Sequence, residues 1–140
     1  MRRNLHGVAF LLCVCLLAVG TEATAGPLTG AKWVWHANAK SSVNVPAGKW
    51  FFRRPLVIPG DKAIRSATCT ITADNAFTLF LNGKKIGSGD NWQKVSSFDV
   101  KTVLNSGKNV LAVEAVNWDG PGANPAGWIA SLHVRFADGK

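Results

Sequence analysis

The chain has 140 residues, a formal net charge of +8 and three cysteines, and 47% of its residues are hydrophobic. This length fits one domain of ordinary size with a core of its own. Beyond the N-terminal segment no apolar run approaches the roughly 20 residues that a membrane-spanning helix needs, so we expect no such helix. The basic residues are scattered as singles and pairs, a pattern typical of a solvated surface, so nucleic acid is not a predicted partner.

The N-terminus has the three parts of a secretory signal peptide. Met1–Arg3 is positively charged, Val8–Val19 is an apolar run too short to span a bilayer, and Ala23–Ala25 is an A-x-A cleavage site. We therefore expect a signal peptide at residues 1–25, one mature domain at residues 26–140, and a secreted or periplasmic location. Cleavage leaves Cys69 as the single cysteine, so the fold must be stable without an internal disulfide.

The first half of the mature chain reads as β-strands. Trp33–Trp35 is a short strand-like run, followed by a turn-rich loop at residues 36–48. Strand alternation over Lys49–Ile58 predicts a core face of Trp50, Phe52, Arg54, Leu56 and Ile58. Because an unpaired buried charge is costly, Arg54 is expected to pair with Glu114 or Asp74, or to lie at the end of the sheet.

The next segment is a strand followed by a hairpin. Over Ile64–Ala73 three threonines alternate with small apolar residues, which places the threonines in water and Cys69 in the core. Asn82-Gly83 tolerates the positive φ angles of a type I′ turn, so we expect it to join Phe77–Leu81 to a returning strand at Lys85–Gly87.

The C-terminal half continues the pattern. We expect a strand at Val95–Val100, one helical turn at Asp99–Leu104, a central strand at Asn109–Asn117 and a last strand at Trp128–Phe136. A long loop of turn residues, 118–127, precedes the last strand. Seven or eight short strands with almost no helix predict an all-β fold, an antiparallel β-sandwich of jelly-roll type.

An ordered set of short motifs supports this fold. The set comprises Trp33–Trp35, Phe52–Arg54, Thr70–Phe77, Phe80–Gly83, Lys85–Gly87 with Trp92, Asp99–Leu104, Gly107–Val113, Asn117 and Gly127–Trp128. With these motifs the chain resembles the galactose-binding-domain-like jelly rolls that accompany bacterial α-L-rhamnosidases. The resemblance implies an accessory domain. It leaves the function open, because this fold carries carbohydrate-binding modules, adhesion domains and spacers alike.

Catalytic motifs are absent from the sequence. His36 and His133 are the only histidines of the mature chain, and neither a G-x-S-x-G nor an H-E-x-x-H motif occurs. The acidic residues are typical of turns and salt bridges. We therefore predict that the protein is not an enzyme.

The residue types that bind sugars are present. A sugar site combines an aromatic ring that stacks on a pyranose with amides and carboxylates that bind its hydroxyl groups. Trp33, Trp35 and Trp50 lie in predicted strands and are expected in the core, whereas Trp92 and Trp118 lie in polar loops. The predicted ligand-binding residues are Trp92, Trp118, Asp74, Asn75, Asn117 and Asp119. Alternatively, both loop tryptophans fold over the open end of the sandwich.

Two further alternatives stay open. Asp74, Asn75, Asp90, Asn91 and Asp119 carry oxygen ligands of the kind that calcium uses, but no metal-loop spacing is matched, so we predict no cofactor and keep a structural calcium as an alternative. The predicted function is an exported, non-catalytic carbohydrate-binding module. The alternative is a structural or adhesive domain that binds another protein of the cell envelope.

Overall fold

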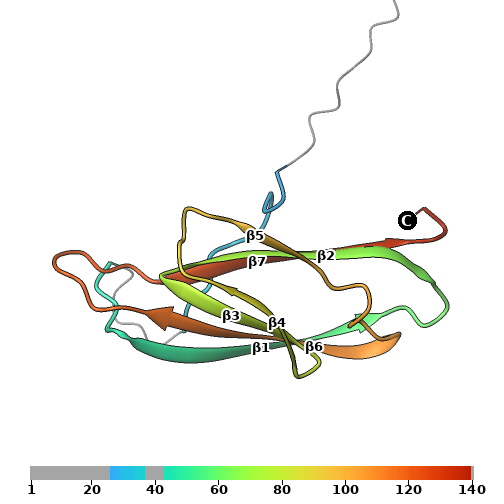
Figure 1. Cartoon of the computed structure of the whole chain (residues 1–140), viewed down its shortest axis with the longest axis horizontal. Helices are drawn as coiled ribbons and strands as arrows, with labels where there is room; N and C mark the ends of the chain where they lie inside the picture. The colour runs from blue at the N-terminus through green and yellow to red at the C-terminus, as the bar shows by residue number, and fades with distance from the viewer. Residues whose placement is uncertain (1–25, 37–42, 140) are drawn as a thin grey trace, which may run out of the picture.

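The fold consists of two antiparallel β-sheets (Figure 1). The structure, a computed structural model, describes residues 26–36 and 43–139. The seven strands are β1 (Gly48–Ile58), β2 (Ile64–Asp74), β3 (Ala76–Leu81), β4 (Lys84–Gly89), β5 (Ser96–Asp99), β6 (Gly107–Asn117) and β7 (Gly127–Phe136). One sheet has the order β1-β6-β3-β4 and the other the order β5-β2-β7. The predicted all-β sandwich is confirmed. The predicted signal peptide lies outside the described residues.

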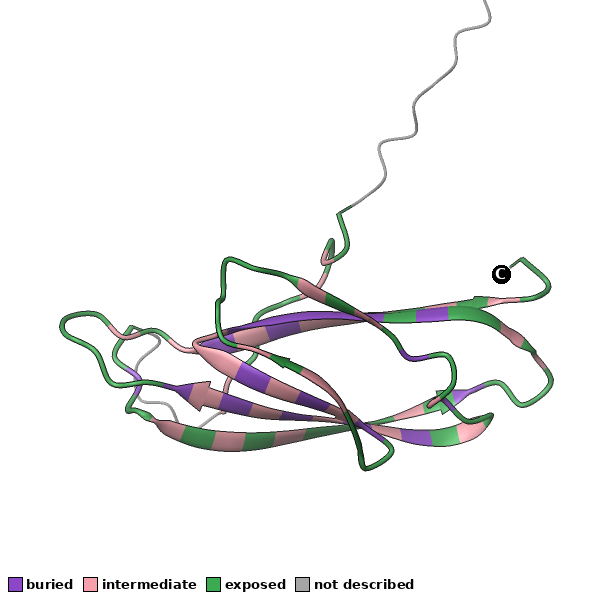
Figure 2. Ribbon diagram, in the orientation of Figure 1, coloured by how far each residue is buried: buried purple, intermediate pink, exposed green. Residues whose placement is uncertain are grey.

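The core lies between the two sheets. Alternate residues of β3 and β6 are buried, as Figure 2 shows, whereas β2 is buried at every position from Cys69 to Ala73. β1 is an edge strand, and most of its positions are half-buried or exposed. The inward side chains of β2, β3 and β6 are Ala67, Cys69, Ile71, Ala73, Phe77, Leu79, Leu81, Leu111, Val113 and Ala115. No helix among the described residues is long and apolar enough to cross a membrane.

The predicted turns are present. Asn82 and Gly83 both have positive φ angles, 52° and 81°, and connect β3 to β4, as a type I′ turn requires. After β5 the N–H groups of Val103 and Leu104 both donate to the carbonyl of Val100, which forms the predicted helical turn. The Lys101 N–H donates to Asp99 Oδ1 and so caps this turn.

The predicted ion pair of Arg54 is wrong. Glu114 Oε1 lies 2.9 Å from Lys49 Nζ instead, and no salt bridge of Arg54 is found in the part of the chain that the structure describes. Arg54 does face the inner side of β1, but β1 is an edge strand, so its long side chain reaches water between the two sheets.

Two smaller expectations also differ from the structure. Thr70 and Thr72 are buried rather than in water, because Ser97 and the backbone at residues 91 and 92 cover them with hydrogen bonds. The run Trp33–Trp35 is not a strand, since only Val34 pairs, in a single antiparallel bridge to Trp128.

Candidate functional site

Four chain segments meet at one end of the sandwich. There β2 ends, β3 begins, β6 ends and β7 begins, and the segment 43–47 before β1 and the loop before β7 lie beside them (Figure 1). All six residues predicted to bind a ligand lie in this region of the fold. The region therefore contains the candidate site.

A cleft of about 380 Å³ lies at this end between two tryptophans. Trp33 and Trp92 line it together with Asp74, Pro125, Ala126 and Gly127, and we call it the Trp33–Trp92 cleft. Both indoles are about half exposed, 52% for Trp33 and 51% for Trp92. The cleft thus combines two flat apolar groups with one carboxylate.

Hydrogen bonds from β2 hold Trp92 in place. The Thr72 hydroxyl donates to the carbonyl oxygens of Trp92 (2.9 Å) and Asn91 (3.3 Å). Within the loop, Asn91 Oδ1 accepts the Gln93 N–H at 2.9 Å. The backbone under the exposed indole is therefore fixed to the sheet although the ring lies in a loop.

Trp33 is positioned by its neighbours. Val34 exchanges two backbone hydrogen bonds with Trp128, of 2.8 and 3.1 Å, and this bridge anchors the segment beside β7. Gly127 has no side chain, so the Trp33 ring lies directly against the start of β7. The prediction that Trp33 belongs to the core is wrong: this side chain is exposed and lines the cleft, which its position in a strand-like run did not indicate.

Asp74 supplies the charge of the cleft. Partial burial raises the pKa of its carboxyl above the ordinary value of 3.8. Asn75 Nδ2 donates to Asp74 Oδ1 at 2.9 Å, and Asn75 Oδ1 accepts the Trp118 N–H at 2.6 Å. The side chain of Asn75 thereby links the cleft to the loop that follows β6.

The other predicted residues lie apart from this cleft. Trp118 is 49% exposed, in agreement with its predicted exposure, but it does not line the cleft. Asn117 is buried, and its amide donates to the carbonyls of Val45 and Pro46. Asp119 lines a separate polar hollow with Asn124 and the segment 44–47. The structure therefore brings together Trp92 and Asp74, and places Asn117 beneath the surface.

Potential metal ligands do not converge within the part of the chain that the structure describes. The described residues contain no cluster of three or more histidine, cysteine, aspartate or glutamate side chains able to hold a metal ion. Cys69 is fully buried, and burial raises the pKa of its thiol to about 11, so the thiol is neutral at physiological pH.

Comparisons with known proteins give one curated relative and several solved structures. No family model matches the chain. An α-L-rhamnosidase of Streptomyces avermitilis is 33% identical over 126 residues, which cover 86% of this chain and 12% of the enzyme. The chain is a homologue of part of an α-L-rhamnosidase. It spans about an eighth of that relative's length.

Solved structures of similar proteins agree with this sequence comparison. The crystal structure of the Streptomyces avermitilis α-L-rhamnosidase complexed with L-rhamnose matches 80% of this chain and 11% of the enzyme chain, with 31% identity and a TM-score of 0.71. A lectin from Pleurotus ostreatus in complex with GalNAc matches 81% of this chain and 32% of its own, with 31% identity and a TM-score of 0.66. The predicted resemblance to galactose-binding-like β-sandwiches is confirmed. Both of these proteins contain a β-sandwich that matches the fold of this chain.

Proposed function

We propose that the protein is an exported, non-catalytic carbohydrate-binding module whose Trp33–Trp92 cleft holds one sugar unit. The observation that carries the proposal is the pair of half-exposed indoles that line one cleft with a carboxylate. Its volume of about 380 Å³ lies in the range of small-molecule sites.

The chemistry of the cleft suits a pyranose. The apolar face of the sugar stacks on an indole, and the stack is favourable because it removes apolar surface of both partners from water. Asp74 carries oxygens that accept hydrogen bonds from sugar hydroxyl groups. One of them already accepts from Asn75, which leaves the second oxygen for the ligand.

The relatives suggest which sugars to test first. The rhamnosidase structure is described as a complex with L-rhamnose, and the fungal lectin as a complex with GalNAc. The chain matches only about an eighth of the rhamnosidase, and its described residues contain no group of three or more histidine, cysteine, aspartate or glutamate side chains that could hold a metal ion, which favours a binding role over a catalytic one.

Calorimetric titration with L-rhamnose, GalNAc and glucose tests the proposal. We expect one of the first two sugars to bind, and Trp33→Ala and Trp92→Ala to lose most of the affinity. Trp118→Ala is the matched control, because Trp118 is equally exposed at the same end but lies outside the cleft. Loss of affinity in Trp118→Ala alone would instead favour the loop that follows β6 as the platform.

The same titration addresses calcium. Repeating it with Ca²⁺ and with EDTA shows whether binding needs the ion, for which Asp74, Asn75 and Asp119 offer oxygen ligands. Unchanged affinity in EDTA would remove the calcium alternative.

The mass of the exported protein tests whether the signal peptide is removed, and a mature chain that begins at Gly26 is the expected result.

A second candidate function rests on a different surface. Phe51 and Val57 on the outer side of β1 are 72% and 71% exposed and are large apolar side chains that a partner could cover. They favour the alternative of a structural or adhesive domain that contacts another envelope protein. If no sugar binds and Phe51→Ser abolishes capture of one defined envelope protein, this alternative replaces the first.

A further inference from the structure

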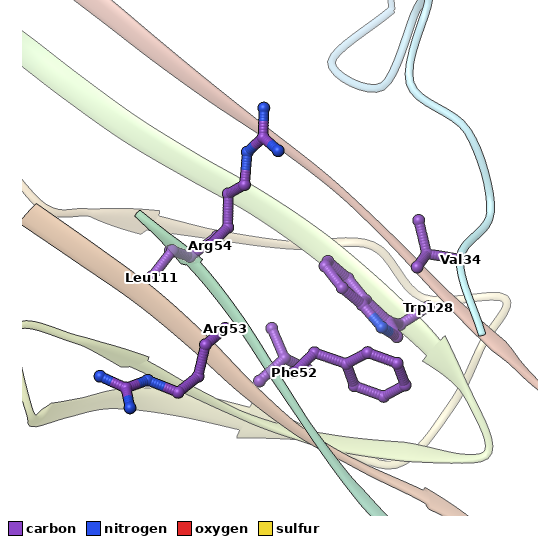
Figure 3. Close-up of a pocket in the computed structure, with 7 residues that line it drawn as sticks. Val34, Phe52, Arg53, Arg54, Leu111 and Trp128 are labelled. Atoms are coloured by element: carbon purple, nitrogen blue, oxygen red, sulfur yellow. The ribbon is translucent and has the colours of Figure 1, made fainter. Parts of the chain in front are cut away.

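A second cleft, separate from the proposed sugar site, opens between the sheets where β1 faces β7. Its volume is about 360 Å³, and its apolar lining consists of Val34, Phe52, Leu111, Val113 and Trp128 (Figure 3). Packing fixes the side chains at the base of the cleft, because Val113 is buried and the rings of Phe52 and Trp128 pack with their centroids 5.5 Å apart. We call it the inter-sheet cleft.

Two arginines of β1, Arg53 and Arg54, also line this cleft, and their side chains extend in different directions. Arg54 extends from β1 toward the facing sheet, whereas Arg53 extends to the other side of the strand (Figure 3). The Arg54 guanidinium is exposed and forms no salt bridge or hydrogen bond within the described residues. Its five N–H donors are therefore available to a ligand.

We propose that the inter-sheet cleft binds a small amphipathic anion, a carboxylate carried on an apolar aryl or alkyl body. The body removes the apolar lining from water, and the carboxylate pairs with the Arg54 guanidinium at the mouth. Arginine suits this task because its planar fork binds a carboxylate through two parallel hydrogen bonds. Binding of a carboxylate would then explain why Arg54 lies on the inner side of β1, among apolar residues, where packing alone does not require a charged side chain.

Calorimetry with matched acids and alcohols tests the charge requirement. We expect 3-phenylpropanoate or octanoate to bind the full-length protein about 10- to 100-fold more tightly than 3-phenylpropan-1-ol or octan-1-ol, the range for a hydrogen bond to a charged group. The aryl and alkyl pairs distinguish the two kinds of body. Equal affinity for acid and alcohol would overturn the proposal, as would no binding of either acid.

The adjacent arginines provide a matched pair of variants. Arg54→Gln should remove the preference for the acid, whereas Arg53→Gln should keep it, because Arg53 extends to the other side of β1. Both side chains are exposed, so both variants should melt like the parent. If the two variants lose the same share of affinity, the acid binds by net charge alone and the cleft is not its site.

A third variant tests the place of binding. Val34 lies at the rim and is 41% exposed, so Val34→Trp should fill the cleft without disturbing the core and should weaken acid and alcohol alike. Unchanged acid affinity in a Val34→Trp protein with a normal melting curve would place the ligand elsewhere. These outcomes do not depend on whether the Trp33–Trp92 cleft binds sugar.

Discussion

Gly127 lies directly beneath the indole of Trp33, and a β-carbon at position 127 would be 2.9 Å from Trp33 Cε3. That separation is shorter than real contacts of a β-carbon, so Gly127→Ala must displace the ring. Since Trp33 is half exposed, the ring can move outward at little cost in stability. We expect Gly127→Ala to weaken sugar binding while the melting temperature hardly changes, as measured by titration and calorimetric melting.

Gly60→Ala is the control for this substitution. Gly60 lies in the turn between β1 and β2, and a β-carbon there meets nothing within 4 Å. It should leave both affinity and melting temperature unchanged. Full sugar affinity in Gly127→Ala would show that the position of the Trp33 ring is unimportant for binding.

The two tryptophans of the cleft should contribute little to stability. Trp33 and Trp92 are about half exposed, and their replacement by alanine opens no internal cavity, so each variant should lose about 1 kcal/mol or less. Phe77→Ala is the contrasting control. Phe77 is buried in the core, and its removal should cost about 3–5 kcal/mol. Urea denaturation measures all three, and a collapsed Trp92→Ala protein would make Trp92 a structural residue.

Most of the strands could be predicted from local sequence. The alternation in β2, the Asn82-Gly83 turn and the apolar run of β6 each depend on neighbouring residues, and the structure contains all three elements. Alternation also identified the inner face of β1. It could not show that β1 is an edge strand, and this is why Arg54 was expected to need a partner.

The candidate site was harder to predict because its parts are far apart in the chain. The sequence indicated Trp92 and Asp74, but Trp33 enters the cleft only through the bridge of Val34 to Trp128, nearly a hundred residues later. An isolated β-bridge, unlike a strand, produces no alternating pattern of apolar residues in the sequence, so this contact could not be predicted. Likewise, burial of Asn117 follows from its hydrogen bonds to residues 45 and 46, which precede β1.

Cys69 should be unreactive in the folded protein. Its thiol is fully buried, and burial raises the pKa from 9.0 to about 11. Because the thiol has a higher pKa in the folded protein than in the unfolded chain, its contribution to stability is complete below pH 9, the pKa of the unfolded chain. This contribution is lost as the pH rises from about 9 to about 11. At pH 8 a disulfide reagent such as DTNB should label the thiol only in urea, at the rate of unfolding. Rapid labelling without urea would contradict the burial.

A buried asparagine should stabilise the end of the sandwich near the β3–β4 turn. Asn109 Oδ1 accepts from the Asn105 N–H and from Asn82 Nδ2, both at 2.8 Å, and Asn109 Nδ2 donates to the carbonyls of Asn105 and Gly107. Asn109→Leu keeps the size of the side chain but leaves these groups unpaired. It should cost at least about 1–3 kcal/mol in urea denaturation.

The control for this prediction is Asn105→Ala. Asn105 is exposed, and its hydrogen bonds with Asn109 use its backbone N–H and carbonyl, which alanine keeps, so this variant should melt like the parent. A parent-like Asn109→Leu protein would mean that water replaces the network without loss.

Asp74 should give stability and sugar affinity opposite dependences on pH. Desolvation raises the pKa of its carboxyl in the folded protein, so its favourable contribution to stability is complete below the ordinary pKa of 3.8 and is lost as the pH rises through the folded pKa. Sugar affinity should rise over the same interval, because the ionised carboxylate is the stronger hydrogen-bond acceptor. Titrations and melting curves between pH 3 and pH 7 measure the two trends. Asp74→Asn should flatten both, whereas Asp61→Asn, on an exposed turn at residues 59–62, should leave both as in the parent. If affinity fell as the pH rose, Asp74 would act as a proton donor in the cleft or would not contact the sugar.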